Sequence, residues 1–222
     1  KSSLLTNRFD FSLPAAFPYP SRRAPVFADN AVAASQPLAA QAGLRMLQSG
    51  GNAVDAALAA AIALTVVEPT STGIGGDAFA LVWDGSALHG LNASGRSPKT
   101  WTPERFAGKE KMPDLGWDTV TVPGCVSAWS VLSGRFGRLP FEALFAPAVG
   151  YARSGFVVSP TVAAQWAEAP ALYADYPEFS AAFLPGGRAP RAGERFRLPD
   201  QAATLEEIAA TGGESFYRGN LA

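Results

Sequence analysis

The longest apolar run of the chain covers residues 53–67 and predicts a buried helix. Asn52 can cap this helix through its side-chain oxygen, Asp55 places a carboxylate near the positive helix end, and Pro69 follows the run. Apolar residues occur on every side of the predicted helix, so the pattern leaves no face suited to water. A membrane span needs roughly 20 apolar residues, and this alanine-rich run is shorter. We therefore expect a helix packed in the protein core.

A glycine-rich loop and two short apolar runs follow this helix. Residues 79–83 and 87–92 flank the turn-forming pair Asp84-Gly85, which predicts an antiparallel hairpin. The preceding residues 73–78 match the G-x-G-x-x-A form of a dinucleotide-binding loop. That loop must follow a strand and open a helix, whereas this one is predicted to follow a helix and open a strand. We favour a tight loop, in which glycine allows close backbone approach or positive φ, over a nucleotide site.

The remaining pattern predicts mostly helices. Prolines at positions 14, 18, 20 and 25 indicate that residues 1–30 form an extended arm. Ser35 is a candidate N-cap for the helix after it. Residues 176–200 are rich in proline, glycine and arginine, which predicts a long loop with at most one short strand, around Phe196. Further strands are predicted at 31–35 and 120–122, and further helices at 36–49, 125–136, 141–154, 161–173 and 201–211, with Glu206 and Glu207 facing water in the last.

Composition narrows the chemistry that the chain can perform. Its 222 residues are 48% hydrophobic and 17% charged, which is typical of a globular protein with a substantial core. The net charge of -1 gives no reason to expect nucleic acid or an anionic membrane as a partner. One cysteine, Cys125, and one histidine, His89, exclude an internal disulfide and argue against a zinc site or a Ser-His-Asp triad. We expect neither a metal nor a cofactor, and we interpret Cys125 as a packed side chain.

The N-terminal residues bear on the compartment. Residues 1–14 lack the apolar segment of a secretory signal, and the sequence contains no apolar run of membrane length. A cytoplasmic protein is expected if Lys1 lies near the true start, and a periplasmic or secreted protein is expected if a signal peptide has been removed.

The polar loop after the predicted hairpin contains a candidate binding residue. It reads Asn92-Ala93-Ser94-Gly95-Arg96-Ser97-Pro98, and sites often collect in loops at strand ends. The guanidinium of Arg96, held between a glycine and a nearby proline, is suited to bond both oxygens of a substrate carboxylate. A surface arginine that bonds nearby carbonyl groups is the alternative, and spacing alone does not separate the two.

A set of ordered motifs resembles the gamma-glutamyltranspeptidase family. The most specific are GGNAVDAA at residues 50–57 and GGDAF at residues 75–79. Shorter matches are VAAS at 32–35, VPGCV at 122–126, FG at 136–137, PA at 147–148, ARSGF at 152–156 and FYRG at 216–219. The matches keep the same order from about Val32 to Gly219, so the resemblance covers most of the chain.

The resemblance implies an N-terminal nucleophile hydrolase of the α+β class, with a four-layer αββα sandwich. Members of this family are made as a zymogen that cuts itself into a large and a small subunit, which form a heterodimer. The nucleophile is the threonine at the start of the small subunit, and its free α-amine can serve as the general base. Backbone donors of the small subunit hold the oxyanion. A nucleophile that carries its own base agrees with the histidine-poor composition.

The chain itself resembles the first part of the large subunit, because it begins with Lys1 and not with the nucleophile. Residues 31–222 are then part of a single αββα domain that another segment or chain completes. No catalytic residue is expected in this chain, and the hydroxyls of Thr70, Ser71 and Thr72 receive no catalytic role. The expected partners are the small subunit from the same precursor and a small-molecule amide substrate.

The sequence differs from the family pattern at the substrate-binding loop. Other members place an arginine, in a D-F-R-E-M-A-P-like stretch, on the α-carboxylate of the γ-glutamyl group. Matching the proline of that stretch to Pro98 puts Ser94 at the arginine position, with Arg96 two residues later. Ser94 and Arg96 are therefore the candidate substrate-binding residues, for a γ-glutamyl or similar small carboxylate-bearing acyl group. The absence of an arginine at its usual position weakens the case for a γ-glutamyl substrate. The motifs S-G-R-S-P at 94–98 and G-I-G-G-D-A-F at 73–79 are closer to the amidohydrolase-like branch, which includes oxamate amidohydrolase.

Three functions stay open at this point. The first is an amidohydrolase or acyltransferase related to the gamma-glutamyltransferases of glutathione metabolism, inactive without its small subunit. The second is a catalytically inactive binding or structural protein derived from the family. The third is a nucleotide-binding enzyme, which titration with a dinucleotide would test. The residues that follow Ala222 would separate the first two.

Overall fold

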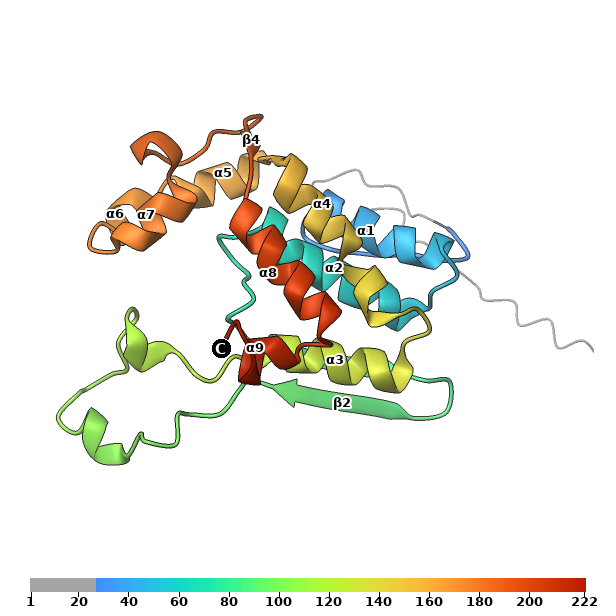
Figure 1. The fold of residues 1–222 in the computed structure, drawn as a ribbon, viewed down its shortest axis with the longest axis horizontal. Coiled ribbons are helices and arrows are strands. Elements are labelled where there is room, and N and C mark those ends of the chain that lie inside the picture. The colour runs from blue at the N-terminus through green and yellow to red at the C-terminus, as the bar shows by residue number, and fades with distance from the viewer. Residues whose placement is uncertain (1–26) are drawn as a thin grey trace, which may run out of the picture.

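The structure is a computed structural model and describes residues 27–222 (Figure 1). The α-helices of this part are α1 (Pro37–Gln48), α2 (Ala53–Val67), α3 (Cys125–Phe136), α4 (Ala146–Ser154), α5 (Pro160–Trp166), α6 (Ala169–Leu172), α7 (Pro177–Phe183), α8 (Pro199–Ala210) and α9 (Glu214–Arg218). The strands are β1 (Ala78–Trp83), β2 (Leu88–Ala93), β3 (Phe156–Val157) and β4 (Arg195–Phe196). Short 3-10 helices cover Pro103–Phe106, Trp117–Thr119, Phe141–Phe145 and Pro185–Gly187.

Helix α2 lies at the centre of this arrangement. Helices α1, α3 and α4 contact it, and α8 packs on α4. Helix α3 also contacts β1 and β2, so it lies between the other helices and the hairpin that these two strands form (Figure 1). Helices α5 to α7 form a separate lobe, drawn in orange, that projects away from the hairpin. The predicted central helix and hairpin are both confirmed.

The local signals at α2 act as the sequence predicts. Asn52 caps the helix, with its side-chain oxygen accepting from the backbone N–H groups of Val54 and Asp55. The helix begins at Ala53 and ends at Val67, as expected. One prediction is partly wrong, because Ala53 and Ala57 are exposed within the described residues. Their small side chains leave a surface strip along a helix that is otherwise largely buried.

The carboxylate of Asp55 joins the start of α2 to the turn after α3. Its side chain is fully buried and accepts from the backbone N–H of Asn52 at 2.8 Å. Both of its oxygens also accept from the N–H of Arg138 at 3.1 Å, and one accepts from Leu139 at 3.3 Å. These bonds satisfy a buried charge with backbone donors from two distant segments. Asp55 is therefore a structural residue of the core.

We expect Asp55→Asn to lower the free energy of unfolding by about 2 kcal/mol. An amide keeps one acceptor oxygen, and its NH2 group would face the N–H groups that now donate to the second carboxylate oxygen. Urea unfolding followed by circular dichroism measures the change. Asp114→Asn is the matched control, because Asp114 is 83% exposed and its loss should change stability by less than about 0.5 kcal/mol. Equal stability of both variants would contradict the structural role.

The hairpin has one face on the core and one apolar face in solvent. Trp83 pairs with Leu88 and Leu81 with Gly90, in an unbroken antiparallel register. Phe79, Leu81, Trp83 and Leu88 are between 64% and 77% exposed within the described residues. Large apolar side chains gathered on one sheet face mark a surface for packing against another element.

Two predicted strands are absent from the described residues, and one predicted cap is wrong. Residues 31–35 and 120–122 belong to no sheet, because a strand needs a partner and neither segment lies in a ladder. Ser35 donates to Glu68 instead of capping α1. Gln36 is the N-cap, because Pro37 fixes the first helical position and restricts the residue before it to an extended backbone.

Prolines also divide the later helices more finely than predicted. Residues 141–154 form a 3-10 helix followed by α4, and the predicted helix at 161–173 is divided into α5 and α6. Pro147 and Pro170 stand in the first turns of α4 and α6, where the missing N–H does no harm but ends any preceding helix. The predicted loop at 176–200 contains α7, while the short strand around Phe196 is confirmed as β4.

Helix α8 starts at Pro199, two residues earlier than predicted. Glu206 and Glu207 are half-buried instead of facing water. Glu206 pairs with Arg153, and Glu207 accepts from the hydroxyl of Ser215. Their surroundings come from other segments of the chain, so the helix pattern alone does not show them.

Most of the predicted N-terminal arm, residues 1–26, lies outside the described residues. Residues 27–30, its last part, contain no helix or strand. Across residues 27–222, no helix is long and apolar enough to cross a lipid bilayer.

Candidate functional site

Two loop segments far apart in the sequence meet at the end of β2. The first is residues 94–98, which carries Arg96, and the second is residues 120–124, which leads into α3. The backbone N–H of Val122 donates to the carbonyl of Arg96 at 2.9 Å, and the Thr121 hydroxyl donates to the carbonyl of Ser94 at 3.2 Å. These bonds fix the backbone on both sides of the Arg96 side chain.

Two glycines make this close approach possible. Gly95 has a φ of +80°, and a Cβ there would lie 2.0 Å from the carbonyl oxygen of Val122. A Cβ on Gly124 would lie 2.0 Å from the carbonyl oxygen of Ala93. Both distances are far inside van der Waals contact, so each position requires glycine. The glycine before Arg96 is therefore a structural requirement of the loop.

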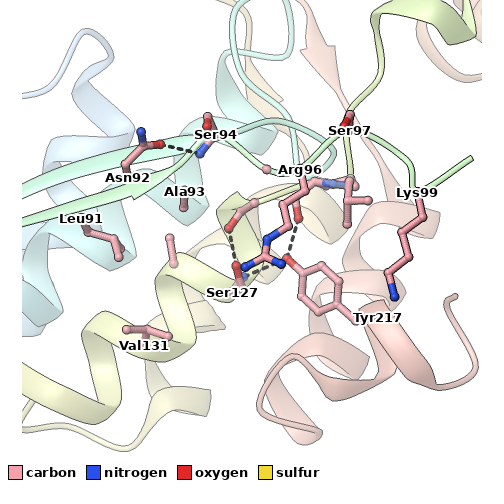
Figure 2. A pocket seen from close by; sticks show the side chains of 15 residues that line it. Leu91, Asn92, Ala93, Ser94, Arg96, Ser97, Lys99, Ser127, Val131 and Tyr217 are labelled. Atoms are coloured by element: carbon pink, nitrogen blue, oxygen red, sulfur yellow. Dashed lines mark hydrogen bonds between the residues drawn. The ribbon is translucent and has the colours of Figure 1, made fainter. Parts of the chain in front are cut away.

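A cavity of about 630 Å³ opens between this loop, α3 and α9 (Figure 2). Arg96 and Lys99 line it together with the hydroxyl-bearing residues Ser94, Ser97 and Ser127. Within residues 27–222, neither the Arg96 guanidinium nor the Lys99 ammonium forms a hydrogen bond or an ion pair. Figure 2 shows the Arg96 side chain extending from its loop towards Ser127 and Tyr217. The cavity thus presents unpaired positive charge, which suits an anionic group.

Tyr217 holds the wall of the cavity opposite the loop. Its hydroxyl donates to the carbonyl of Pro123 at 2.7 Å and accepts from the backbone N–H of Ser127 at 2.9 Å (Figure 2). The hydroxyl of Ser127 donates to the carbonyl of Gly124. The first turn of α3 is therefore tied to α9 at the point where the loop carrying Arg96 crosses it.

The glycine-rich loop after α2 lies behind the same turn. The carbonyl of Gly76 accepts from the backbone N–H groups of Gly124 and Cys125, and the Cys125 thiol donates to the carbonyl of Ile74 at 2.9 Å. The loop follows a helix and opens a strand, as predicted, which is the reverse of a dinucleotide-binding loop. Gly73 and Gly75 have neither positive φ nor a close neighbour within the described residues, so the interpretation as a sterically tight loop is wrong for them.

Cys125 is a packed side chain, as predicted. It is buried in the core, and this burial raises the pKa of its thiol to about 11. A thiol that stays protonated at neutral pH is a poor nucleophile.

The structure places Ser94 and Arg96 on the wall of one cavity, and both are exposed in the described part of the chain. Sequence reasoning missed Lys99, Ser127 and Tyr217. Tyr217 belongs to the FYRG motif, which indicated the family but did not predict a position for this side chain. No sequence pattern pointed to Ser127 or Lys99. Across residues 27–222, no group of three or more His, Cys, Asp or Glu side chains could hold a metal ion.

Comparison with known proteins gives the family. The gamma-glutamyltranspeptidase family model matches residues 39–222. The chain belongs to the gamma-glutamyltranspeptidase family. Over 188 residues it is 41% identical to the glutathione hydrolase-like YwrD proenzyme of Bacillus subtilis, a match over 83% of this chain and 36% of that protein. It is also 40% identical over 195 residues to the oxamate amidohydrolase proenzyme of Klebsiella pneumoniae, again over 83% of this chain and 36% of that protein.

Solved structures of gamma-glutamyltranspeptidase relatives confirm the fold class. The cephalosporin acylase of Bacillus halodurans superposes with a TM-score of 0.86 at 51% identity, over 94% of this chain and 41% of that chain. The gamma-glutamyltranspeptidase of Helicobacter pylori gives a TM-score of 0.84 at 29% identity, over 90% of this chain and 59% of that chain. The α+β fold of the N-terminal nucleophile hydrolases is therefore the fold of this chain. The chain spans about a third of the length of the curated relatives named above.

Proposed function

We propose that residues 31–222 form the N-terminal part of the large subunit of a self-processed amide hydrolase or acyltransferase. Family membership and the proenzyme names of the relatives support this proposal. The nucleophile is a threonine outside this chain, at the start of a small subunit cut from the same precursor. That threonine attacks the amide carbonyl while its α-amine takes the hydroxyl proton. The C–N bond then breaks, the proton passes to the leaving amine, and water or an acceptor amine takes the acyl group from the threonine ester.

In this proposal, another part of the same precursor packs against the apolar face of the hairpin. Phe79, Leu81, Trp83 and Leu88 expose large apolar surface within residues 27–222, and a second sheet from the rest of the domain would bury it. The four-layer sandwich expected for the family requires such a pair of sheets. In the assembled protein the cavity beside Arg96 then lies next to this junction, since Leu91 and Asn92 of β2 also line it.

The substrate is a small acyl group that carries a carboxylate, and Arg96 binds that carboxylate with Ser94 beside it. The observation that carries this assignment is the guanidinium of Arg96, which has no partner among residues 27–222 and lies on a cavity wall whose backbone is fixed on both sides. A planar guanidinium can bond both carboxylate oxygens at once. Lys99 adds positive charge to the same cavity.

Arg96→Ala should lower kcat/KM on a carboxylate-bearing amide by roughly 30- to 1,000-fold in the assembled enzyme. Arg96→Lys should restore part of this loss, because an ammonium cannot reproduce the two parallel bonds of the guanidinium. The measurement compares hydrolysis of the carboxylate-bearing amide with hydrolysis of its uncharged isostere. The loss should be confined to the charged substrate.

Arg45→Ala is the matched control, because Arg45 is exposed at the end of α1 and lines no cavity near the site. It should leave both rates within twofold of the parent enzyme. Gel electrophoresis of the processed subunits checks that each variant still cuts itself. Equal losses on both substrates would rule out a carboxylate-binding role and leave Arg96 as a residue that shapes the loop.

A further inference from the structure

A second cavity lies in the lobe of α5 to α7, away from the candidate site. Its volume is about 310 Å³, within the lower range of small-molecule sites, and it shares no lining residue with the cavity beside Arg96. Four aromatic rings line it, those of Trp166, Tyr173, Phe179 and Phe183. The rings of Tyr173 and Phe179 are stacked with centroids 4.1 Å apart, and Phe183 follows at 5.0 Å from Phe179. The lobe thus builds one continuous aromatic wall.

The charged side chain among the described lining residues is a carboxylate. Glu168 lines the cavity, and its carboxylate forms no hydrogen bond or ion pair with any residue in the described range 27–222. The Oε1 atom of Gln165 accepts from the hydroxyl of Thr70 at 2.8 Å, which fixes the amide at the rim. Among residues 27–222, no lysine or arginine lines the cavity.

The other charged residues of helices α5 to α7 are negative as well. Residues 160–187 contain the carboxylates of Glu168, Asp175 and Glu178 and no lysine or arginine. A cation is therefore attracted to this lobe and not repelled from it. A ring face that its stacked neighbour leaves open attracts a cation through the ring quadrupole, and the aromatic carbons accept the apolar substituents of an organic cation.

We propose that this cavity binds a small organic cation of the substituted-ammonium class. The methyl or alkyl groups contact the rings of Tyr173, Phe179 and Phe183, and the positive charge lies near the carboxylate of Glu168. An inorganic cation would gain little from the aromatic wall, and a neutral apolar molecule would leave the carboxylate unpaired. The combination of both features selects an organic cation. The proposal is independent of the proposed function, because binding is measured without turnover and at different residues.

The test is calorimetric titration of the full protein with choline and with its uncharged carbon isostere, 3,3-dimethylbutanol. We expect saturable choline binding with a dissociation constant of about 1 mM or lower. The isostere has the same shape without the charge, so it should bind about five- to thirtyfold more weakly.

Three variants test whether choline binds in this cavity. Glu168→Gln should weaken choline binding about three- to fivefold, and Phe179→Leu, which keeps an apolar side chain without the ring, about threefold or more. Glu178→Gln is the matched control, since Glu178 is an exposed carboxylate of the same lobe that does not line the cavity, and it should change binding less than twofold. Glu168 is exposed, so its variant should fold normally even if Phe179→Leu does not. Absence of saturable choline binding, equal affinity for the isostere, or undiminished binding by Glu168→Gln would each overturn the proposal.

Discussion

Ala59→Asp should abolish soluble expression of the protein. Ala59 is 0% exposed on α2, inside the core that α1, α3 and α4 build around this helix. An aspartate there would bury a carboxylate without a partner, at a cost of about 3–5 kcal/mol. A typical domain has a total stability of about 5–15 kcal/mol, so this change removes a large part of it. The measurement is the fraction of the variant in the soluble extract, followed by thermal unfolding of any soluble protein.

Ala57→Asp provides the matched control for this experiment. Ala57 lies on the same helix and is exposed within the described residues, so the same substitution should leave expression and folding largely intact. Both variants change helix propensity by the same amount, which leaves burial as the difference between them. Normal stability of Ala59→Asp would show that α2 does not form the core.

The chain from Lys1 to Ala222 should have no amidase activity when it is expressed alone. The proposed nucleophile lies outside it. Near the glycine-rich loop, the Thr70 hydroxyl donates to Gln165 and the Thr72 hydroxyl donates to the carbonyl of Glu68. In the proposed enzyme the cavity beside Arg96 binds the substrate, and we expect no activated nucleophile among residues 27–222. Hydrolysis of γ-glutamyl and simple acyl anilides by the isolated chain is the measurement.

The complete precursor is the positive control for this prediction. Self-cleavage to expose an N-terminal threonine, detected by mass and N-terminal sequencing, should accompany the appearance of activity. Hydrolysis by the isolated chain would overturn the location of the nucleophile. A complete precursor without that threonine would instead support the alternative of an inactive binding or structural protein.

Much of this fold is determined by local features of the sequence. The cap at Asn52 and the uninterrupted apolar run set both ends of α2, and the Asp84-Gly85 turn between apolar runs set the hairpin. Helix α3 likewise begins and ends where its pattern predicts, at Cys125 and Phe136. These signals act over a few residues, so they need no knowledge of the rest of the chain. The ordered motifs also indicate the family from the sequence alone, because each motif is a short string of neighbouring residues.

Tertiary structure decided the features that depend on distant partners. Residues 31–35 and 120–122 look like strands but lack a neighbouring strand among the described residues, and a strand is stable only in a ladder. The candidate site joins Arg96 to Ser127 and Tyr217, which are 31 and 121 positions further along the chain, and no local pattern connects them. The aromatic cavity of the α5 to α7 lobe arises in the same way, in a segment predicted as one helix followed by a long loop. Sequence periodicity reports which side of an element is apolar, whereas a cavity depends on which elements meet there.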